Sequence, residues 1–247
     1  MIDLAKVRAI DFHTHAEESC GCHADDGYDD LQSTMAKYFG APWAHPPTIP
    51  ETAAHYREQN IAAVIFPVDA ERETGYRRYN NYEVAEACAK EADILIPFAS
   101  IDPAKGKLGA REARDLVANH GVRGFKFHPT MQGFYPNDRS AYTLYEAIAE
   151  TGKPALFHTG QTGVGSGMKG GNGMRLKYSN PMYIDDVAVD FPDMPIILAH
   201  PSFPWQEEAL SVAQHKPNVY IDLSGWSPKY FPEILVRYAN TMLKKKM

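Results

Sequence analysis

The sequence predicts an α/β fold, a (β/α)₈ barrel of the TIM type, on the strength of three observations. Short apolar runs alternate with segments of helical pattern along the chain, which is typical of βαβ units and a parallel sheet. The runs are almost continuously apolar, as expected for strands that are covered on both faces. Polar or reactive residues follow most of the runs, and barrels build their active sites at that end from several strands. The alternative is an open doubly wound sheet, which would gather its chemistry at one switch point.

The candidate strands and helices follow from these patterns. The apolar runs that we interpret as strands are residues 7–12, 61–68, 94–101, 122–127, 154–157, 195–199 and 219–223. The helical patterns between them cover residues 81–91, 110–119, 141–150, 185–190 and 205–214. These units are one strand short of a full barrel, so we expect the eighth strand and the C-terminal helices to be missing from this sequence. No linker divides the chain, which predicts a single domain over residues 1–247.

Composition excludes several classes of function. The net charge of −6 gives no electrostatic footprint for nucleic acid or an anionic membrane. No apolar run approaches the roughly 20 residues that span a bilayer. The 3 cysteines are too few for a disulfide framework, which favours a cytoplasmic location. The expected partner is therefore a small-molecule substrate, and a homodimer remains an open alternative.

Two connections are longer than the usual loops of about two to six residues. Residues 16–50 follow the first predicted strand, and the Gly-rich residues 159–182 follow the fifth. Both leave the predicted active face, so they are candidates for lids or substrate walls, with plain surface insertion as the alternative. In the second connection Arg175, Lys177 and Tyr178 are candidate substrate contacts for a carboxylate or phosphate, or else a solvated patch.

Histidines end three of the predicted strands. The first ends in His13-Thr14-His15, and alternate strand residues share a face, so both rings should point the same way. His158 and His200 follow the fifth and sixth strands. Each alone could be a hydrogen-bonded core residue, but together they predict a site for one divalent metal ion. Imidazole favours Zn²⁺, with Mn²⁺ as the alternative, and a catalytic site needs about three protein ligands and an open position.

Motifs around these histidines resemble those of a known family. They are the N-terminal His-x-His, Gly124-Phe125-Lys126-Phe127-His128-Pro129, Phe157-His158-Thr159-Gly160, Ala199-His200-Pro201 and Asn218-Val219-Tyr220-Ile221-Asp222-Leu223-Ser224-Gly225. In this order they resemble the amidohydrolase superfamily, in particular the branch with aminocarboxymuconate-semialdehyde decarboxylase and γ-resorcylate decarboxylase. The resemblance runs from about residue 7 to the end of the chain.

The resemblance implies roles for individual residues. It makes His13, His15 and His158 metal ligands, and it makes His200 the acid/base residue beside them. A divalent ion activates water at neutral pH and polarises a carbonyl. The expected activity is hydrolysis of a small carbonyl or carboxylate compound, with an aromatic one as a candidate. Non-oxidative decarboxylation of an aromatic or unsaturated carboxylic acid is the alternative.

Lys126 and His128 share a face at the end of the fourth predicted strand. We expect them to contact substrate or to hydrogen-bond the ligands. Binuclear relatives leave a third use open, a carboxylated Lys126 that bridges two metals. Asp11 is predicted on the face of the ligands, where it either orients one of them or is a satisfied buried carboxylate.

Two features depart from the family pattern or stand outside it. The family carries an aspartate after its eighth strand, whereas this sequence ends at Met247 where that strand is expected to begin. A truncated chain is the favoured interpretation, so an inactive fragment or a non-catalytic binding barrel stays a second alternative. Cys20-Gly21-Cys22-His23 resembles part of a structural zinc site, but it is one ligand short and is more simply interpreted as a loop.

Overall fold

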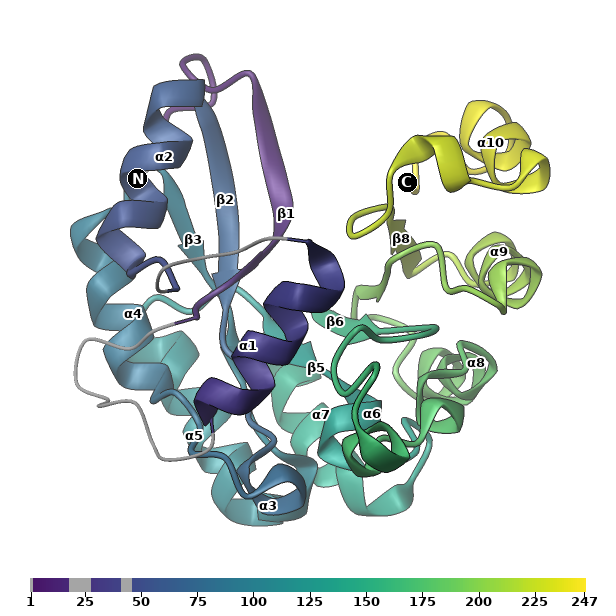
Figure 1. Ribbon diagram of the computed structural model, residues 1–247, viewed down its shortest axis with the longest axis horizontal. Helices are drawn as coiled ribbons and strands as arrows, with labels where there is room; N and C mark the ends of the chain where they lie inside the picture. The colour runs from purple at the N-terminus through teal and green to yellow at the C-terminus, as the bar shows by residue number, and fades with distance from the viewer. Residues whose placement is uncertain (1, 18–27, 41–45) are drawn as a thin grey trace.

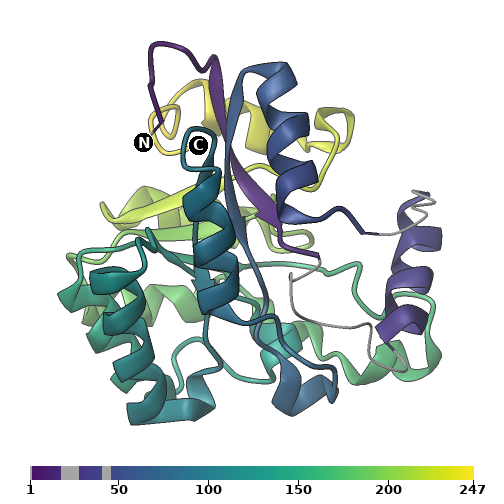
Figure 2. The same cartoon turned by 90° about the vertical axis from the view of Figure 1, so that its left-hand side faces the viewer.

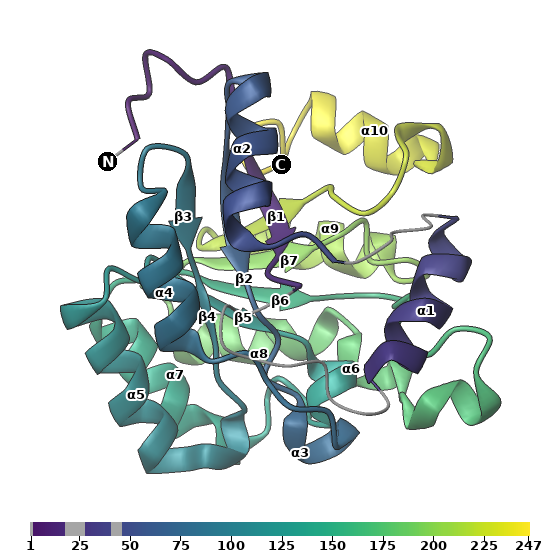
Figure 3. The same ribbon diagram turned by 60° about the vertical axis from the view of Figure 1, so that its left-hand side comes forward.

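The computed structural model describes residues 2–17, 28–40 and 46–247 of the chain. Its strands are all parallel and follow one another in space in the order of the sequence. They are β1 (Ala9–His15), β2 (Ile61–Phe66), β3 (Leu95–Pro97), β4 (Ala99–Ser100), β5 (Phe125–Phe127), β6 (Ala155–His158), β7 (Ile196–Ala199) and β8 (Val219–Asp222). Figures 1 and 3 show these strands at the centre with helices around them. This is the predicted α/β barrel of the TIM type.

The predicted third strand is divided in the structure. The apolar run at residues 94–101 forms β3 and β4, which are separated at Phe98. As a result β1–β2–β3 form one sheet and β4–β5–β6–β7–β8 form the other. β1 and β8 are the first and last strands, and within the described residues they do not pair with each other. The side chains of His13 and Asp222 nevertheless meet across this junction.

Helices cover the outside of the strands (Figure 2). Those of eight residues or more are α1 (Tyr28–Phe39), α2 (Ile49–Gln59), α4 (Asn81–Lys90), α5 (Gly106–Asn119), α7 (Tyr142–Glu150), α8 (Met182–Asp190), α9 (Gln206–His215) and α10 (Glu233–Asn240). Single turns are α3 (Glu71–Thr74) and α6 (Pro129–Gln132), with 3₁₀ turns η1 (Pro103–Lys105), η2 (Arg139–Ala141), η3 (Lys169–Gly173), η4 (Leu176–Ser179) and η5 (Pro228–Tyr230). None of the described helices has the length and apolar character to cross a membrane.

The predicted helices are present, and further ones were missed. The patterns at 81–91, 110–119, 141–150, 185–190 and 205–214 correspond to α4, α5, α7, α8 and α9. The prediction missed α2, although Thr48 and Glu51 form a complete capping box at its start. It also missed α10 and treated residues 16–50 as one long connection, which the structure corrects, since α1 and the start of α2 lie within it.

The core has an inner and an outer part. Phe66, Phe98, Leu156 and Ile197 pack together inside the barrel, with Phe12 against them. The outer faces of β4–β8 pack on α5, α7, α8 and α9, and those of β1–β3 pack on α2 and α4. Strands covered on both faces explain why their sequences are almost continuously apolar. This packing also fixes the positions of the strand ends, where the polar side chains gather.

Candidate active site

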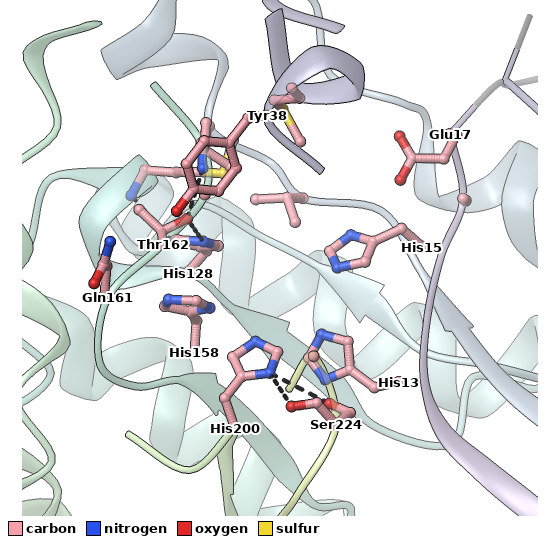
Figure 4. Close-up of a pocket in the computed structure, with 18 of the residues that line it drawn as sticks. His13, His15, Glu17, Tyr38, His128, His158, Gln161, Thr162, His200 and Ser224 are labelled. Atoms are coloured by element: carbon pink, nitrogen blue, oxygen red, sulfur yellow. Dashed lines mark hydrogen bonds between the residues drawn. The ribbon is translucent and has the colours of Figure 1, made fainter. Parts of the chain in front are cut away.

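A cavity of about 810 Å³ opens at the carboxyl ends of the strands. His13 and His15 from β1, His158 from β6 and His200 after β7 line it, and we call these four residues the histidine cluster (Figure 4). Aromatic side chains form much of the surrounding wall, namely Tyr38, Tyr76, Tyr79, Trp226 and Tyr230. Tyr38 comes from α1, so the first long connection does contribute to the cavity wall.

The histidine cluster brings together residues that are far apart in the sequence. The ring centroids of His13 and His15 are 5.3 Å apart, so the two rings of β1 do lie on one side. His200 stands between the two ends of the cluster, with its centroid 4.6 Å from that of His13 and 4.8 Å from that of His158. The predicted convergence of strand-end histidines at one mouth is therefore present.

Burial keeps the imidazoles of the cluster neutral. Loss of solvation, together with the smaller effect of the charge of Lys126, lowers the pKa of His15 to about 3 and that of His200 to about 4. The pKa values of His13 and His158 are also well below 6.5, chiefly through burial. Neutral imidazole is the form that offers a lone pair to a metal ion. The Nε2 atom of His158 is buried and has no hydrogen-bond partner among the described residues.

Asp222 and Ser224 each accept a hydrogen bond from Nδ1 of a ring in the histidine cluster. Nδ1 of His13 lies 2.8 Å from Oδ2 of Asp222, and Nδ1 of His200 lies 3.0 Å from the carbonyl oxygen of Ser224. His200 has a φ of 77°, a strained value for a residue other than glycine. Gly225 has a φ of 78°, and a Cβ there would lie 2.7 Å from Nδ1 of His200, so only glycine fits this turn.

Lys126 lies beneath the cluster and not in the cavity wall. Its side chain is fully buried, and Nζ approaches Nε2 of His13 to 3.3 Å and the ring of Phe66 to 4.8 Å. Burial lowers the pKa of Lys126 to about 7, although the charge of Asp222 opposes the shift. Lys126 is therefore placed to hydrogen-bond a predicted ligand, one of the uses that the sequence suggested.

His128 lines the cavity but has both ring nitrogens engaged. Its ring stacks on that of His158 with centroids 3.9 Å apart and an angle of 8° between the planes. Nδ1 accepts a hydrogen bond from the N–H of Met131 at 3.3 Å, so Nε2 carries the proton and donates it to Oγ1 of Thr162 at 3.3 Å. These contacts hold the ring of His128 in place against that of His158.

The side chains of the histidine cluster are of the type that binds divalent metal ions, but they are not arranged to coordinate one. Neutral imidazoles, among them the unpartnered Nε2 of His158, are the donors that zinc and related ions take. As the side chains stand, no three His, Cys, Asp or Glu residues in the described part of the chain form a metal-binding group. The Nζ of Lys126 faces Nε2 of His13, the nitrogen that would be the donor. Binding an ion therefore requires adjustment of these side chains.

The predicted contacts in the second long connection are not brought to the cavity. Arg175, Lys177 and Tyr178 are absent from its lining. The ammonium of Lys177 lies instead 5.5 Å from the ring centroids of Tyr135 and Tyr178, and the Arg175 carbonyl accepts a hydrogen bond from Thr130. Thr162, Gly163 and Val164 of the same connection do line the cavity. The segment forms part of the wall, but these three residues are not in the cavity lining.

Asp11 and the Cys-Gly-Cys-His motif complete the set of predicted residues. Asp11 accepts hydrogen bonds from the hydroxyl of Tyr56 at 2.6 Å and from the backbone N–H of His13 at 2.9 Å. It is thus the satisfied carboxylate of the two alternatives and does not contact an imidazole. Cys20-Gly21-Cys22-His23 lies outside the described residues.

The sequence prediction missed Asp222, Ser224 and Arg77. Asp222 ends β8 in the same way as His158 ends β6, so the rule that found the histidines would also have found it. Arg77 lines the cavity and is exposed, and the part of the chain that is described offers it no ion pair. It follows α3 in a polar stretch with no distinguishing sequence signal.

A second polar cluster lies at neighbouring strand ends and is paired internally. Nζ of Lys105 lies 2.6 Å from Oδ2 of Asp69, and Nε of Arg72 lies 2.9 Å from Oδ2 of Asp102. Asp69 also accepts the N–H of Asp102 at 3.0 Å. We call these four residues the ion-pair cluster. Both carboxylates are buried and satisfied, and none of the four residues lines the cavity.

The fold and site define the class of parallel α/β barrels that carry their chemistry at the carboxyl ends of the strands. The family model described as Amidohydrolase matches residues 10–247. The chain therefore belongs to the amidohydrolase family. Among curated proteins, "Protein fluG" of Emericella nidulans is 33% identical over 81 residues, which are 33% of this chain and 8% of that protein. The chain thus spans a small part of the length of this relative.

Solved structures share the fold at low sequence identity. An uncharacterized TIM-barrel protein, Bb4693 of Bordetella bronchiseptica, has a TM-score of 0.73 at 21% identity, over 96% of this chain and 83% of its own. The 5-carboxyvanillate decarboxylase of Novosphingobium aromaticivorans, complexed with manganese and 4-hydroxy-3-methoxy-5-nitrobenzoic acid, has a TM-score of 0.62 at 14% identity, over 98% and 84%. The probable 2-pyrone-4,6-dicarboxylic acid hydrolase of Acinetobacter baumannii has a TM-score of 0.59 at 15% identity, over 96% and 79%.

Proposed function

We propose that the chain is a metal-dependent hydrolase that acts on a small carbonyl or carboxylate compound of the size of an aromatic ring. The observation that carries the proposal is the histidine cluster at the floor of the cavity. His13, His15 and His158 would hold one divalent ion, zinc first and manganese as the alternative. The bound ion would supply an activated water and polarise the substrate carbonyl.

His200 is the proposed acid/base residue. Its Nδ1–H donates to the carbonyl of Ser224, so the neutral ring presents the lone pair of Nε2. With a pKa of about 4, His200 begins in the form that accepts a proton. A positioned group of this kind can take a proton from the attacking water and return it to the leaving group.

The cavity wall supports a flat substrate with a negative charge. Its volume of about 810 Å³ lies within the range of about 300–1,000 Å³ for small-molecule sites. Tyr76, Tyr79 and Trp226 offer aromatic surface, and the guanidinium of Arg77 can pair with a carboxylate. Lys126 would hydrogen-bond the proposed ligand His13 from below, and His128 would support His158.

Decarboxylation is the second candidate function. It is favoured by the similarity to 5-carboxyvanillate decarboxylase and to 2,6-dihydroxybenzoate decarboxylase, both with aromatic substrates in their names. The same residues would then hold the ion and the substrate carboxylate, and a proton would be delivered to the ring carbon. The histidine cluster serves either reaction, so the assay must separate them.

The test combines metal analysis with a substrate panel. Purified chain loaded with zinc or manganese should hold about one ion, and His15→Asn should hold far less. The control His55→Gln changes an exposed histidine outside the cavity lining and should bind metal like the wild type. Esters and lactones test hydrolysis, whereas carbon dioxide release from aromatic acids tests decarboxylation. Well under one ion per wild-type chain would contradict both functions, and metal binding without turnover of either panel would support a binding barrel.

A further inference from the structure

The carboxylate of Asp222 joins the two outer strands of the barrel. Its Oδ2 lies 2.8 Å from Nδ1 of His13, on β1, and 2.8 Å from the hydroxyl of Ser224. Its Oδ1 accepts the backbone N–H of Ser224 at 2.9 Å. The side chain of Asp222 is 11% exposed, so these contacts are largely shielded from water. Both oxygens thus accept hydrogen bonds, and one of the donors is an imidazole of the histidine cluster.

Ser224 extends this contact to a second imidazole. Its carbonyl oxygen lies 3.0 Å from Nδ1 of His200, and its hydroxyl oxygen lies 3.3 Å from the same nitrogen. Because the hydroxyl proton of Ser224 is directed to Asp222, its oxygen is free to face the N–H of His200. A hydrogen-bonded path therefore runs from His13 through Asp222 and Ser224 to His200.

The acceptors on this path determine which nitrogen carries the proton in each ring. A carboxylate and a carbonyl can only accept, so the neutral rings of His13 and His200 must both be protonated at Nδ1. Their Nε2 atoms are then left with lone pairs. A ligating histidine commonly donates its other N–H to a carboxylate or carbonyl in this way, which fixes the ring and raises its basicity.

We propose that Asp222 and Ser224 are positioning residues that hold His13 and His200 in the Nδ1–H form, so that a metal ligand and the acid/base residue both keep the lone pair on Nε2. The proposal deepens the proposed function, since it rests on those two roles. It also gives Asp222 a use other than closing the junction between β1 and β8. Gly225 contributes to the same arrangement, because its lack of a Cβ leaves room for the ring of His200.

Asp222→Asn tests the proposal with little change of shape. With its oxygen turned to the N–H of Ser224, the amide offers an N–H where His13 now donates, so His13 should shift toward the Nε2–H form. Nitrogen-15 NMR of the metal-free protein reads this tautomer directly. Zinc affinity by competition titration should fall by about 10- to 100-fold.

Two further variants separate positioning from general damage. Ser224→Ala keeps the carbonyl that binds His200, so the Nδ1–H form of His200 should persist, and loss of this form would show that the carbonyl does not fix the tautomer. Asp11→Asn is the matched control, because Asp11 contacts the backbone of His13 but not its ring. It should leave both the His13 tautomer and the zinc affinity unchanged.

The outcomes distinguish this proposal from the proposed function. An Nε2–H tautomer of His13 in the wild-type protein would overturn the proposal, even if the Asp222→Asn variant failed to fold. So would an unchanged tautomer or an unchanged zinc affinity in Asp222→Asn. If the wild-type chain binds neither zinc nor manganese, the proposed function fails, whereas the tautomer measurements still decide whether Asp222 positions His13.

Discussion

The histidine cluster and the ion-pair cluster lie at the same end of the barrel but differ in how their polar groups are paired. In the ion-pair cluster the buried carboxylates of Asp69 and Asp102 each have a cationic partner within 3 Å. In the histidine cluster the rings are neutral, and Nε2 of His158 is buried without a partner in the described structure. Buried polar groups are nearly always paired, so the unpaired nitrogen of His158 supports the proposed site.

This difference suggests that the two clusters divide structure from function. Removing a partner from the ion-pair cluster leaves a charge unpaired and should cost mainly stability. Removing the ring of His15, His158 or His200 leaves no charged partner behind and should cost mainly activity. The variants below test this division, beginning with the largest expected effect.

His200→Asn should lower kcat by about 10²- to 10⁴-fold, because the variant loses the proton acceptor of the proposed reaction. Asparagine tolerates the positive φ of His200, so the fold should be retained. Steady-state kinetics on the best substrate of the panel, with thermal unfolding as the control, measures both effects. Activity within a few-fold of wild type would show that His200 is not the acid/base residue.

Gly225→Ala should lower kcat by on the order of 10- to 100-fold, since a Cβ at this position would displace the ring of His200. Gly167→Ala is the matched control. Gly167 has a similar φ of 80°, but nothing lies within 4 Å of its added Cβ. Both variants bear the strain of a left-handed residue, about 1–2 kcal/mol. Equal kinetics in the two would mean that the position of His200 does not matter.

Asp69→Asn should lower the free energy of unfolding by about 1–3 kcal/mol, because Lys105 loses its close carboxylate partner. The nearest alternative for Lys105 is Glu112, at 3.8 Å. Urea denaturation measures the change, and kcat of the folded variant should remain close to wild type. A large loss of kcat at unchanged stability would reverse the division between the clusters.

Arg77→Gln should raise the KM for carboxylated substrates by about 10-fold, with little change in kcat, because it removes one charge-assisted hydrogen bond. Arg175→Gln is the control, since Arg175 does not line the cavity. Uncharged esters should show no KM effect in either variant. If Arg175→Gln raises KM and Arg77→Gln does not, the sequence prediction was right and the cavity has been assigned the wrong anchor.

The stability of the metal-free protein should fall as the pH drops below about 6.5. The folded pKa values of His15 and His200, about 3 and 4, lie below the unfolded value, so the unfolded chain binds more protons in this range. Each such histidine contributes up to about 1.4 kcal/mol per pH unit. Urea midpoints at pH 7, 6 and 5 measure the slope, which should decrease in His15→Gln. A flat profile would show that these rings take up protons as readily in the folded state as in the unfolded chain.

The comparison of the two clusters also shows how much of the fold and site could be predicted from the sequence. Apolar periodicity is local, so the strands and most barrel helices were predicted close to their observed bounds. His13, His15, His158 and His200 were found because each ends a strand, and the strand ends of a barrel share one face. Asp222 satisfies the same rule, but its contact with His13, 209 residues away in the sequence, could not be predicted.

What the sequence determined by itself is the order of the strands, the layering of helices around them and the imidazole donors at their carboxyl ends. Tertiary structure alone decided which side chains meet. It left Arg175 and Lys177 out of the cavity lining, brought Arg77 to the cavity wall, and placed the Asp222 carboxylate against Nδ1 of His13. The physical reason is that burial, hydrogen-bond direction and tautomer depend on groups from distant strands, whereas secondary structure depends largely on neighbours along the chain.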